Sequence, residues 1–208
     1  MSLDLWLTFV AASTALLLIP GPTVLLVLSY ALSQGRRVAL ASATGVALGD
    51  LIAMTASLLG LGALVLASAT LFTLLKWIGA AYLIWMGLKL LRTPRIDGLE
   101  AVATPDSTPR KVLAHAAAVT ALNPKSIGFF IAFVPQFVTL DAPLAPQFAI
   151  LIATFVALAA LNALAYALLA DRLRATIKWP SVITWLTRSG GMALIGMGVM
   201  TATLRRAG

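Results

Sequence analysis

The chain has 208 residues, of which 61% are hydrophobic and only 11% charged, and its formal net charge is +8. A soluble domain carries about 25% charged residues, so this composition excludes an ordinary water-soluble globular protein. Cysteine is absent, which excludes disulfide exchange and thiolate metal sites. Several apolar runs exceed the ~20 residues needed to cross a bilayer, and in lipid such runs must be helical. The sequence therefore predicts an all-α integral membrane protein.

Six apolar segments follow one another along the chain and predict six transmembrane helices. Their approximate ranges are Leu5–Tyr30, Val38–Leu66, Phe72–Leu91, Val112–Phe137, Leu144–Ala170 and Ser189–Leu204. A hydrophilic loop at about 92–110 separates the third helix from the fourth. The segment Arg172–Arg188 is basic and partly amphipathic, and we expect it to lie at the membrane interface.

Basic residues are concentrated in alternate connections between these helices. They occur in the loops between helices 1 and 2, 3 and 4, and 5 and 6, whereas Ala67–Leu71 and Thr139–Pro143 contain neither Lys nor Arg. The positive-inside rule places the basic loops in the cytoplasm and both termini in the periplasm. Arg205 and Arg206 argue against a periplasmic C-terminus, because basic residues favour the cytoplasmic side. This distribution explains the net charge without a nucleic-acid partner.

The two halves of the chain are related by an internal repeat. The pattern G-x-x-x-L-I-x-M-G at 79–87 recurs at 190–198, an offset of 111 residues, and Gly21-Pro22 and Asn123-Pro124 are related by an offset of 102. We predict a single transmembrane transporter domain over 1–208, with repeat one at about 1–92 and repeat two at about 111–208. Three helices per repeat is an odd number, so the halves would be inverted, which is typical of secondary transporters.

Proline interrupts the first and fourth predicted helices at matching depths. Pro20, Gly21 and Pro22 lie inside the first helix, and Asn123 and Pro124, followed by Lys125, lie inside the fourth. Proline removes a main-chain donor and breaks or kinks a helix, and broken backbone at membrane depth is tolerated where it lines a cavity. Paired breaks indicate a substrate-binding site, although the prolines could simply kink the helices.

Asp50 is the only carboxylate deep in a predicted span. An ionised carboxylate at mid-bilayer is unfavourable by ~2.5–3.5 kcal/mol on the insertion scale, so such residues are usually functional. Gly45 and Gly49 precede it and allow another helix to pack closely. Asp50 is therefore a candidate for proton coupling or for anchoring a cationic group, unless it is a neutral, hydrogen-bonded packing residue. Asn162, 112 residues further on, is its candidate uncharged counterpart and an additional substrate-binding residue.

Three other polar residues allow more than one interpretation. Lys125 could attract a substrate carboxylate, pair with Asp50, or snorkel to a membrane boundary. His115 is predicted to lie at the interface, with a proton relay as the alternative. Gln136 is predicted to cap or pack near a helix end.

Together these segments resemble the LysE/RhtB family of bacterial amino-acid exporters. The resemblance covers nearly the whole chain in family order. The matching segments are 19–22 (I-P-G-P), 33–37 (S-Q-G-R-R), 45–50 (G-x-x-x-G-D), 76–83 (K-W-x-G-x-x-Y-L), 122–125 (L-N-P-K), 133–137 (F-x-P-Q-F) and 194–198 (L-I-G-x-G).

The resemblance implies an exporter of amino acids or close derivatives in the bacterial inner membrane, driven by proton exchange and dimeric. It implies no enzyme activity and no cofactor. One departure concerns helix 5, where many relatives carry an acid and this chain offers only Asn162. The alternatives are an exporter of another small solute, an exporter of a metal cation, and a membrane scaffold. A single carboxylate provides few ligands for a metal cation. A rhomboid-type protease would need a Gly-x-Ser-Gly motif, which the sequence lacks.

Overall fold

The computed structural model describes residues 1–19, 21–34, 36–67, 69–92, 108–139, 142–177 and 180–203, so Pro20 and most of the hydrophilic loop lie outside it. The described residues form helices and no strand. In chain order the elements are α1 (Leu3–Leu18), α2 (Pro22–Gln34), α3 (Arg36–Ala67), α4 (Ala69–Arg92), α5 (Pro109–Ala121), α6 (Pro124–Ala132), the 3-10 helix η1 (Val134–Phe137), α7 (Leu144–Ile177) and α8 (Pro180–Thr203).

Both predicted helix breaks are present. The first predicted span is divided into α1 and α2, which meet at 56°, and the fourth into α5 and the α6–η1 segment, which meet at 45°. Proline is the first residue of both α2 and α6. Its ring fixes φ near the helical value and needs no donor there, so a second helix starts at each proline instead of continuing the first.

Five segments of the described chain are long and apolar enough to cross a membrane, if each bent pair counts as one span. Three are single helices, at Arg36–Ala63, Thr73–Arg92 and Leu144–Ala170, and two are the bent pairs α1–α2 and α5–α6–η1. The helix expected as the sixth span is present as α8 but is not among these five. The all-helical membrane architecture is therefore established, and the sixth span stays a prediction.

The segment Arg172–Arg188, predicted to lie at the membrane interface, is divided between the two neighbouring helices, and its position at the interface stays a prediction. The α7 helix continues to Ile177, and α8 already begins at Pro180. Strong helix formers such as Ala, Leu and Arg extend α7 beyond its apolar part, and Pro180 is well placed at the start of a helix.

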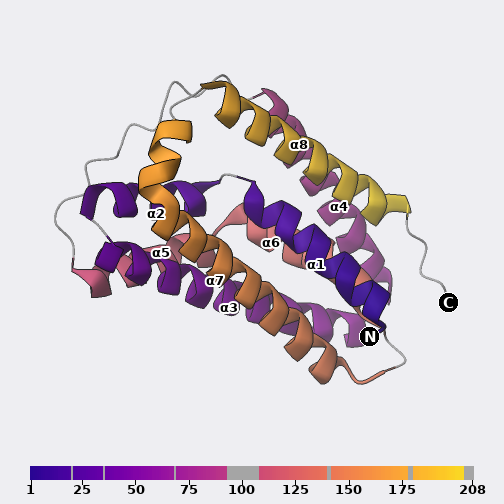
Figure 1. The fold of residues 1–208 in the computed structure, drawn as a ribbon. Coiled ribbons are helices and arrows are strands. Elements are labelled where there is room, and N and C mark those ends of the chain that lie inside the picture. Colours follow the sequence, from indigo (N-terminus) through magenta and orange to yellow (C-terminus); the bar gives the residue numbers. More distant parts are fainter. Residues whose placement is uncertain are drawn as a thin grey trace.

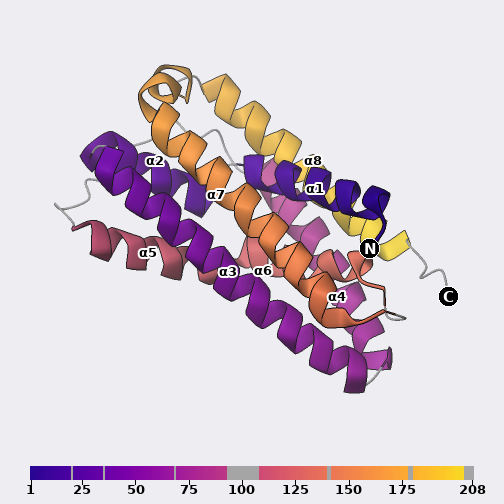
Figure 2. The ribbon, with the colours of Figure 1, turned by 60° about the horizontal axis from the view of Figure 1, so that its bottom comes forward.

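The long helices α3 and α7 cross at the centre of the molecule, and the broken helices pack against them (Figures 1 and 2). The α5 helix lies along α3, whereas α1 and α2 contact α7. The α4 and α8 helices pack on each other along one flank. A Cβ built on Gly87 would lie 2.7 Å from Ile195, and one built on Gly198 would lie 2.6 Å from Ile84. These contacts require α4 and α8 to run antiparallel.

A cluster of phenylalanine rings forms the core beside the broken helices. Phe129 and Phe133 of the second bent segment stack at 5.2 Å, and Phe130 meets Phe155 of α7 edge-on at 4.8 Å. Each of these four residues is at most 1% exposed. The cluster fixes α6 and η1 against α7, because large buried rings leave little freedom to rearrange.

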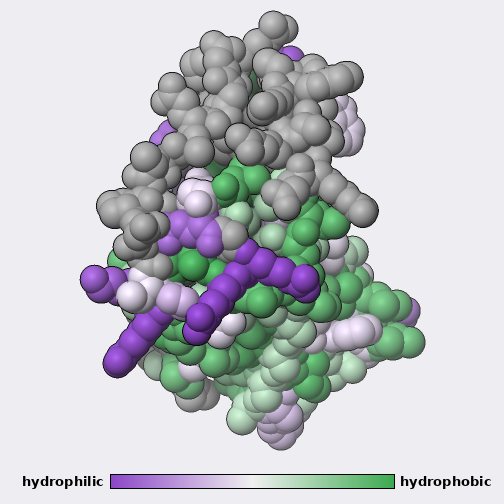
Figure 3. All heavy atoms as spheres, turned by 60° about the vertical axis from the view of Figure 1, so that its left-hand side comes forward, coloured by the Kyte–Doolittle hydropathy of each residue, from purple (hydrophilic) through white to green (hydrophobic). Residues whose placement is uncertain are grey.

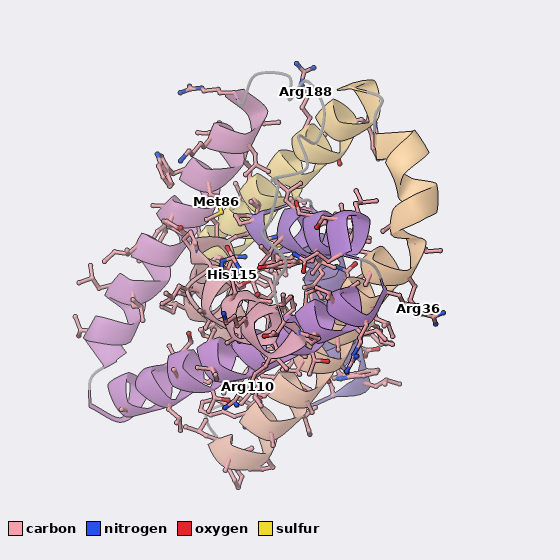
Figure 4. The ribbon with its side chains drawn as sticks, turned by 90° about the vertical axis from the view of Figure 1, so that its left-hand side faces the viewer. Arg36, Met86, Arg110, His115 and Arg188 are labelled. Carbon is pink, nitrogen blue, oxygen red and sulfur yellow. The ribbon has the colours of Figure 1, made fainter. Side chains whose placement is uncertain are left out.

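The basic residues at the starts of α3 and α5, which are Arg36, Arg37, Arg110 and Lys111, lie at one end of the molecule. Tyr30, Val38 and Val112 pack together, which brings the end of α2 and the starts of α3 and α5 to the same place. Hydrophilic side chains extend from this end, and hydrophobic residues cover the surface below them (Figure 3). Arg188 extends outward at the top of Figure 4, and Arg36 at its right-hand side.

Candidate functional site

A small cavity lies where the two helix breaks meet α3 and α7. Its volume is about 30 Å³, room for one or two water molecules, whereas small-molecule pockets measure ~300 Å³ or more. Four predicted site residues line it, namely Asp50, Asn123, Lys125 and Asn162. The other lining residues are Leu16, Leu17, Thr23, Val24, Val27, Val46, Ser126, Ala159, Ala163 and Tyr166. The structure thus brings together residues that are more than 100 positions apart.

The first break is held by side chains from the second half of the chain. The Lys125 ammonium Nζ donates to the carbonyl oxygens of Leu16 at 3.1 Å and Ile19 at 3.0 Å. The Asn162 amide donates to the carbonyl of Leu17 at 3.1 Å. These carbonyls belong to the C-terminal end of α1, where the last acceptors of a helix lack the donors of a following turn. The Leu16 carbonyl also accepts from the main-chain N–H of Ile19 at 3.2 Å, so Lys125 is its second donor. In this structure the Lys125 ammonium group is therefore turned into the protein and bound to main-chain carbonyls, and it does not extend to a membrane boundary.

The second break is held mainly by its own residues. Asn123 is the N-cap of α6, and its Oδ1 accepts from the main-chain N–H of Lys125 at 3.0 Å. The Asn123 amide nitrogen donates to the Thr23 hydroxyl at 3.1 Å, and Thr23 is 3.5 Å from the Thr120 hydroxyl. An N-cap of this kind satisfies a donor that the helix start leaves open.

Gly21, Pro22 and Pro124 lie at the two breaks but do not line the cavity. A Cβ built on Gly21 would lie 3.4 Å from Nζ and 3.7 Å from Cε of Lys125, so the lysine passes directly over this glycine. Pro22 and Pro124 begin the helices that follow each break.

Sequence reasoning missed Thr23, Ser126 and Tyr166 as cavity residues. A signal for Thr23 exists, since it lies 102 positions before Lys125 and so occupies the matching place after the first break. Nothing in the sequence distinguishes Ser126 or Tyr166 from other polar residues near a helix.

Asp50 lies in the wall of the cavity and is 2% exposed. Its Oδ1 oxygen is buried and has no hydrogen-bond partner among the described residues. Burying an unpaired charge is highly unfavourable, so a carboxyl group in this position either takes up a proton or binds a cation.

Gly45 and Gly49 let α5 approach α3 closely beside Asp50. A Cβ on Gly45 would overlap the carbonyl oxygen of Leu113, and one on Gly49 would lie 2.5 Å from that of Ala117. Small residues at these positions are therefore required for the close packing of the two helices.

His115 and Gln136 lie outside the cavity. The Tyr30 hydroxyl and Nδ1 of His115 are 2.8 Å apart, and the histidine is on the surface of α5 (Figure 4). The Gln136 amide donates to the Thr201 hydroxyl at 2.6 Å, linking η1 to α8. Within the described part of the chain, no three His, Cys, Asp or Glu side chains come together in a way that could hold a metal ion.

Comparisons with known proteins agree with this architecture. The chain matches the LysE type translocator family over residues 14–205. It is 34% identical to an uncharacterized membrane protein of Vibrio cholerae over 99% of this chain and all of that protein. It is also 34% identical to the homoserine/homoserine lactone efflux protein of Salmonella typhimurium over the full length of both.

A leucine efflux protein of an Enterobacter species is 31% identical over 67% of this chain and 66% of that protein. No solved structure matches the chain. The named relatives are transporters and not enzymes. The family match covers both helix breaks and the helices that line the cavity. The chain therefore belongs to the LysE family of membrane translocators.

Proposed function

We propose that this protein exports amino acids or close derivatives across the bacterial inner membrane, through a mid-membrane site between the two broken helices. The observation that carries the proposal is the cavity, in which the C-terminal end of α1, Asp50 and Lys125 come together. The Pro20–Pro22 and Asn123–Lys125 segments and Asn162 form the substrate site. An amino compound with an uncharged side chain is favoured, because the relatives' names specify homoserine, homoserine lactone and leucine.

Alternating access is the mechanism we infer. A cavity of about 30 Å³ cannot hold an amino acid, so the closed arrangement must open to admit one. An inverted repeat is supported by the α4–α8 crossing: the Gly87–Ile195 and Gly198–Ile84 contacts exchange under the repeat offset of 111 residues. Rocking of one repeat against the other would expose the site to each side in turn.

Asp50 is the proposed proton-coupling residue. It is the one carboxyl group lining the cavity, and its Oδ1 oxygen lacks a partner. Binding of a proton from outside and its release inside would return the empty carrier and make export an antiport. Asn162 cannot titrate, so the scheme uses a single carboxyl group.

Orientation and assembly follow as further proposals. The end of the molecule with Arg36, Arg37 and Arg110 faces the cytoplasm, because basic residues favour that side. The termini then face the periplasm. The homodimer implied by the family resemblance remains a prediction.

The test compares wild-type protein, Asp50→Asn and Asp4→Asn in inverted membrane vesicles. Uptake of radiolabelled homoserine, homoserine lactone and leucine is measured with and without an imposed pH gradient. We expect wild type and Asp4→Asn to accumulate at least one compound when a gradient is present. Asp50→Asn should lose gradient-driven accumulation and keep exchange of internal for external substrate. Asp4 is a suitable control because it is exposed at the start of α1.

Two results would contradict parts of this proposal. If Asp50→Asn accumulates substrate as wild type does, the proton role of Asp50 is lost and the exporter function stands. If no amino compound moves while expressing cells gain resistance to a metal cation or another solute, the substrate class is wrong.

A further inference from the structure

The Lys125 ammonium is bound by two main-chain carbonyls of the opposite half of the protein. Lys125 lies in the first turn of α6, and its side chain reaches across the cavity to Leu16 and Ile19 at the end of α1. The C-terminal end of a helix carries a partial negative charge and unsatisfied acceptors, so it attracts a cation. This contact joins the two breaks through one removable side chain.

The same cavity contains a second acceptor for a cation. Asp50 is 2% exposed, lines the cavity, and has a buried Oδ1 oxygen without a partner among the described residues. Lys125 is the only cationic residue among those that line the cavity. The cavity thus has two acceptor sites for a cation, the end of α1 and the Asp50 carboxyl group, and one cation of its own.

We infer that the carbonyls of Leu16 and Ile19 are the binding site for the ammonium group of the substrate, and that Lys125 occupies this site in the closed protein. The inference rests on the proposed function and specifies how the substrate is recognised. An arriving primary amine displaces Nζ of Lys125, which then turns toward Asp50. Because the lysine also joins α6 to α1, its displacement releases the first break and lets the cavity enlarge.

The chemistry of the named substrates of the relatives agrees with recognition through the amine. Homoserine, homoserine lactone and leucine all carry a primary amine, whereas the lactone has no free carboxylate. A site built on two carbonyls binds an ammonium group in all three. A site that relied on Lys125 to bind a carboxylate would fail with the lactone.

A cysteine-labelling experiment tests whether Lys125 holds the break closed. The chain contains no cysteine, so Val27→Cys is a unique reporter, and Val27 is a cavity residue that is 1% exposed. The rate of N-ethylmaleimide labelling is measured in native membranes. Adding Lys125→Met should raise the rate by at least about tenfold, because it removes both hydrogen bonds of the charged ammonium group. Lys125→Arg, which keeps a charged donor, should stay near the parent rate.

A second variant covers the case in which Lys125→Met does not fold. Gly21→Val places side-chain atoms where Lys125 crosses the break, since even a Cβ there would be 3.4 Å from Nζ. It should raise labelling in the same direction. If labelling is unchanged both in folded Lys125→Met and in Gly21→Val, Lys125 does not hold the break and the inference is overturned.

A binding measurement tests the ammonium site itself. Purified wild type and Lys125→Met are titrated with leucine, homoserine lactone and the N-acetyl derivative of each. Lys125→Met should bind the amines about tenfold more tightly, because its own competitor is gone, and neither protein should bind the acetylated forms. Weaker amine binding in Lys125→Met, or equal binding of acetylated forms, overturns the assignment. If wild type neither binds nor transports any amine, the proposed function fails, whatever the labelling shows.

Discussion

The two helix breaks differ in how their main-chain groups are satisfied. At the break between α1 and α2, Lys125 and Asn162 reach from the other half of the chain to bind the carbonyls of α1. At the break between α5 and α6, Asn123 caps the helix that directly follows it. The first break is therefore satisfied by side chains from the other half of the chain, which a ligand can replace. The second has a local cap, to which Asn123–Thr23 and Tyr82–Pro124 add hydrogen bonds from the first half.

Packing reinforces this difference. The α5 helix is held against α3 by Gly45 and Gly49, and α6 is fixed by stacked phenylalanine rings such as Phe129 and Phe133. We therefore regard α5 and α6 as the fixed part of the site and the end of α1 as the part that moves. Three substitutions test this comparison of the two breaks. They add to the transport, labelling and binding experiments described above.

The largest effect on stability is expected from Gly49→Ala, which disturbs the packing of α5 in the fixed part of the site. The new Cβ would lie 2.5 Å from the Ala117 carbonyl oxygen and 2.7 Å from Cβ of Thr120, and neither atom can move away without a shift of the α5 main chain. We expect a loss of about 3 kcal/mol in the free energy of unfolding, the upper end for overpacking. The measurement is denaturation in mixed micelles, followed by the fluorescence of the five tryptophans.

Gly60→Ala in the same helix is the matched control. A Cβ at Gly60 has no heavy atom within 4 Å, so the stability should stay within about 1 kcal/mol of wild type. If both alanine variants are equally stable, α5 is not clamped against α3 and the comparison fails.

A smaller effect is expected from Asn123→Ala, which removes the cap of the second break. It deletes the N-cap contact with Lys125 and the hydrogen bond to Thr23, and we expect a loss of about 2 kcal/mol. Asn123→Ser keeps a capping oxygen and should recover about half of the loss. Equal losses in the two variants would show that the cap contributes nothing to the stability of this break.

The smallest effect is expected from Asn162→Ala at the first break. It removes one hydrogen bond to Leu17, and such bonds inside membranes contribute about 0.6 kcal/mol on average. Thr154→Val, which removes the hydrogen bond from Trp6 between the same two helices, is the control remote from the break. The two should be equally stable, but only Asn162→Ala should speed labelling at Val27→Cys. A loss larger than that of Asn123→Ala would reverse the proposed roles of the two breaks.

The sequence alone determined the all-helical character of the protein and the location of the breaks. Long apolar runs can satisfy the hydrogen bonds of their main chain in lipid only as helices. Proline cannot continue a helix, so the breaks follow from the local chemistry of Pro22 and Pro124. It also singled out Asp50, because a lone carboxyl group in an apolar span is costly unless it has a role. It ended the fifth helix too early and began the sixth too late, because the tendency to form a helix continues into Arg172–Arg188 despite the change in polarity.

Only the tertiary structure decided what each polar side chain contacts. The sequence left Lys125 with three possible interpretations, and the fold placed its ammonium group on the carbonyls of Leu16 and Ile19. It likewise brought Thr23 to Asn123 across 100 positions of the chain. Such contacts depend on how the helices cross, and helix crossing is set by the packing of many small and aromatic residues at once, which a linear pattern does not contain.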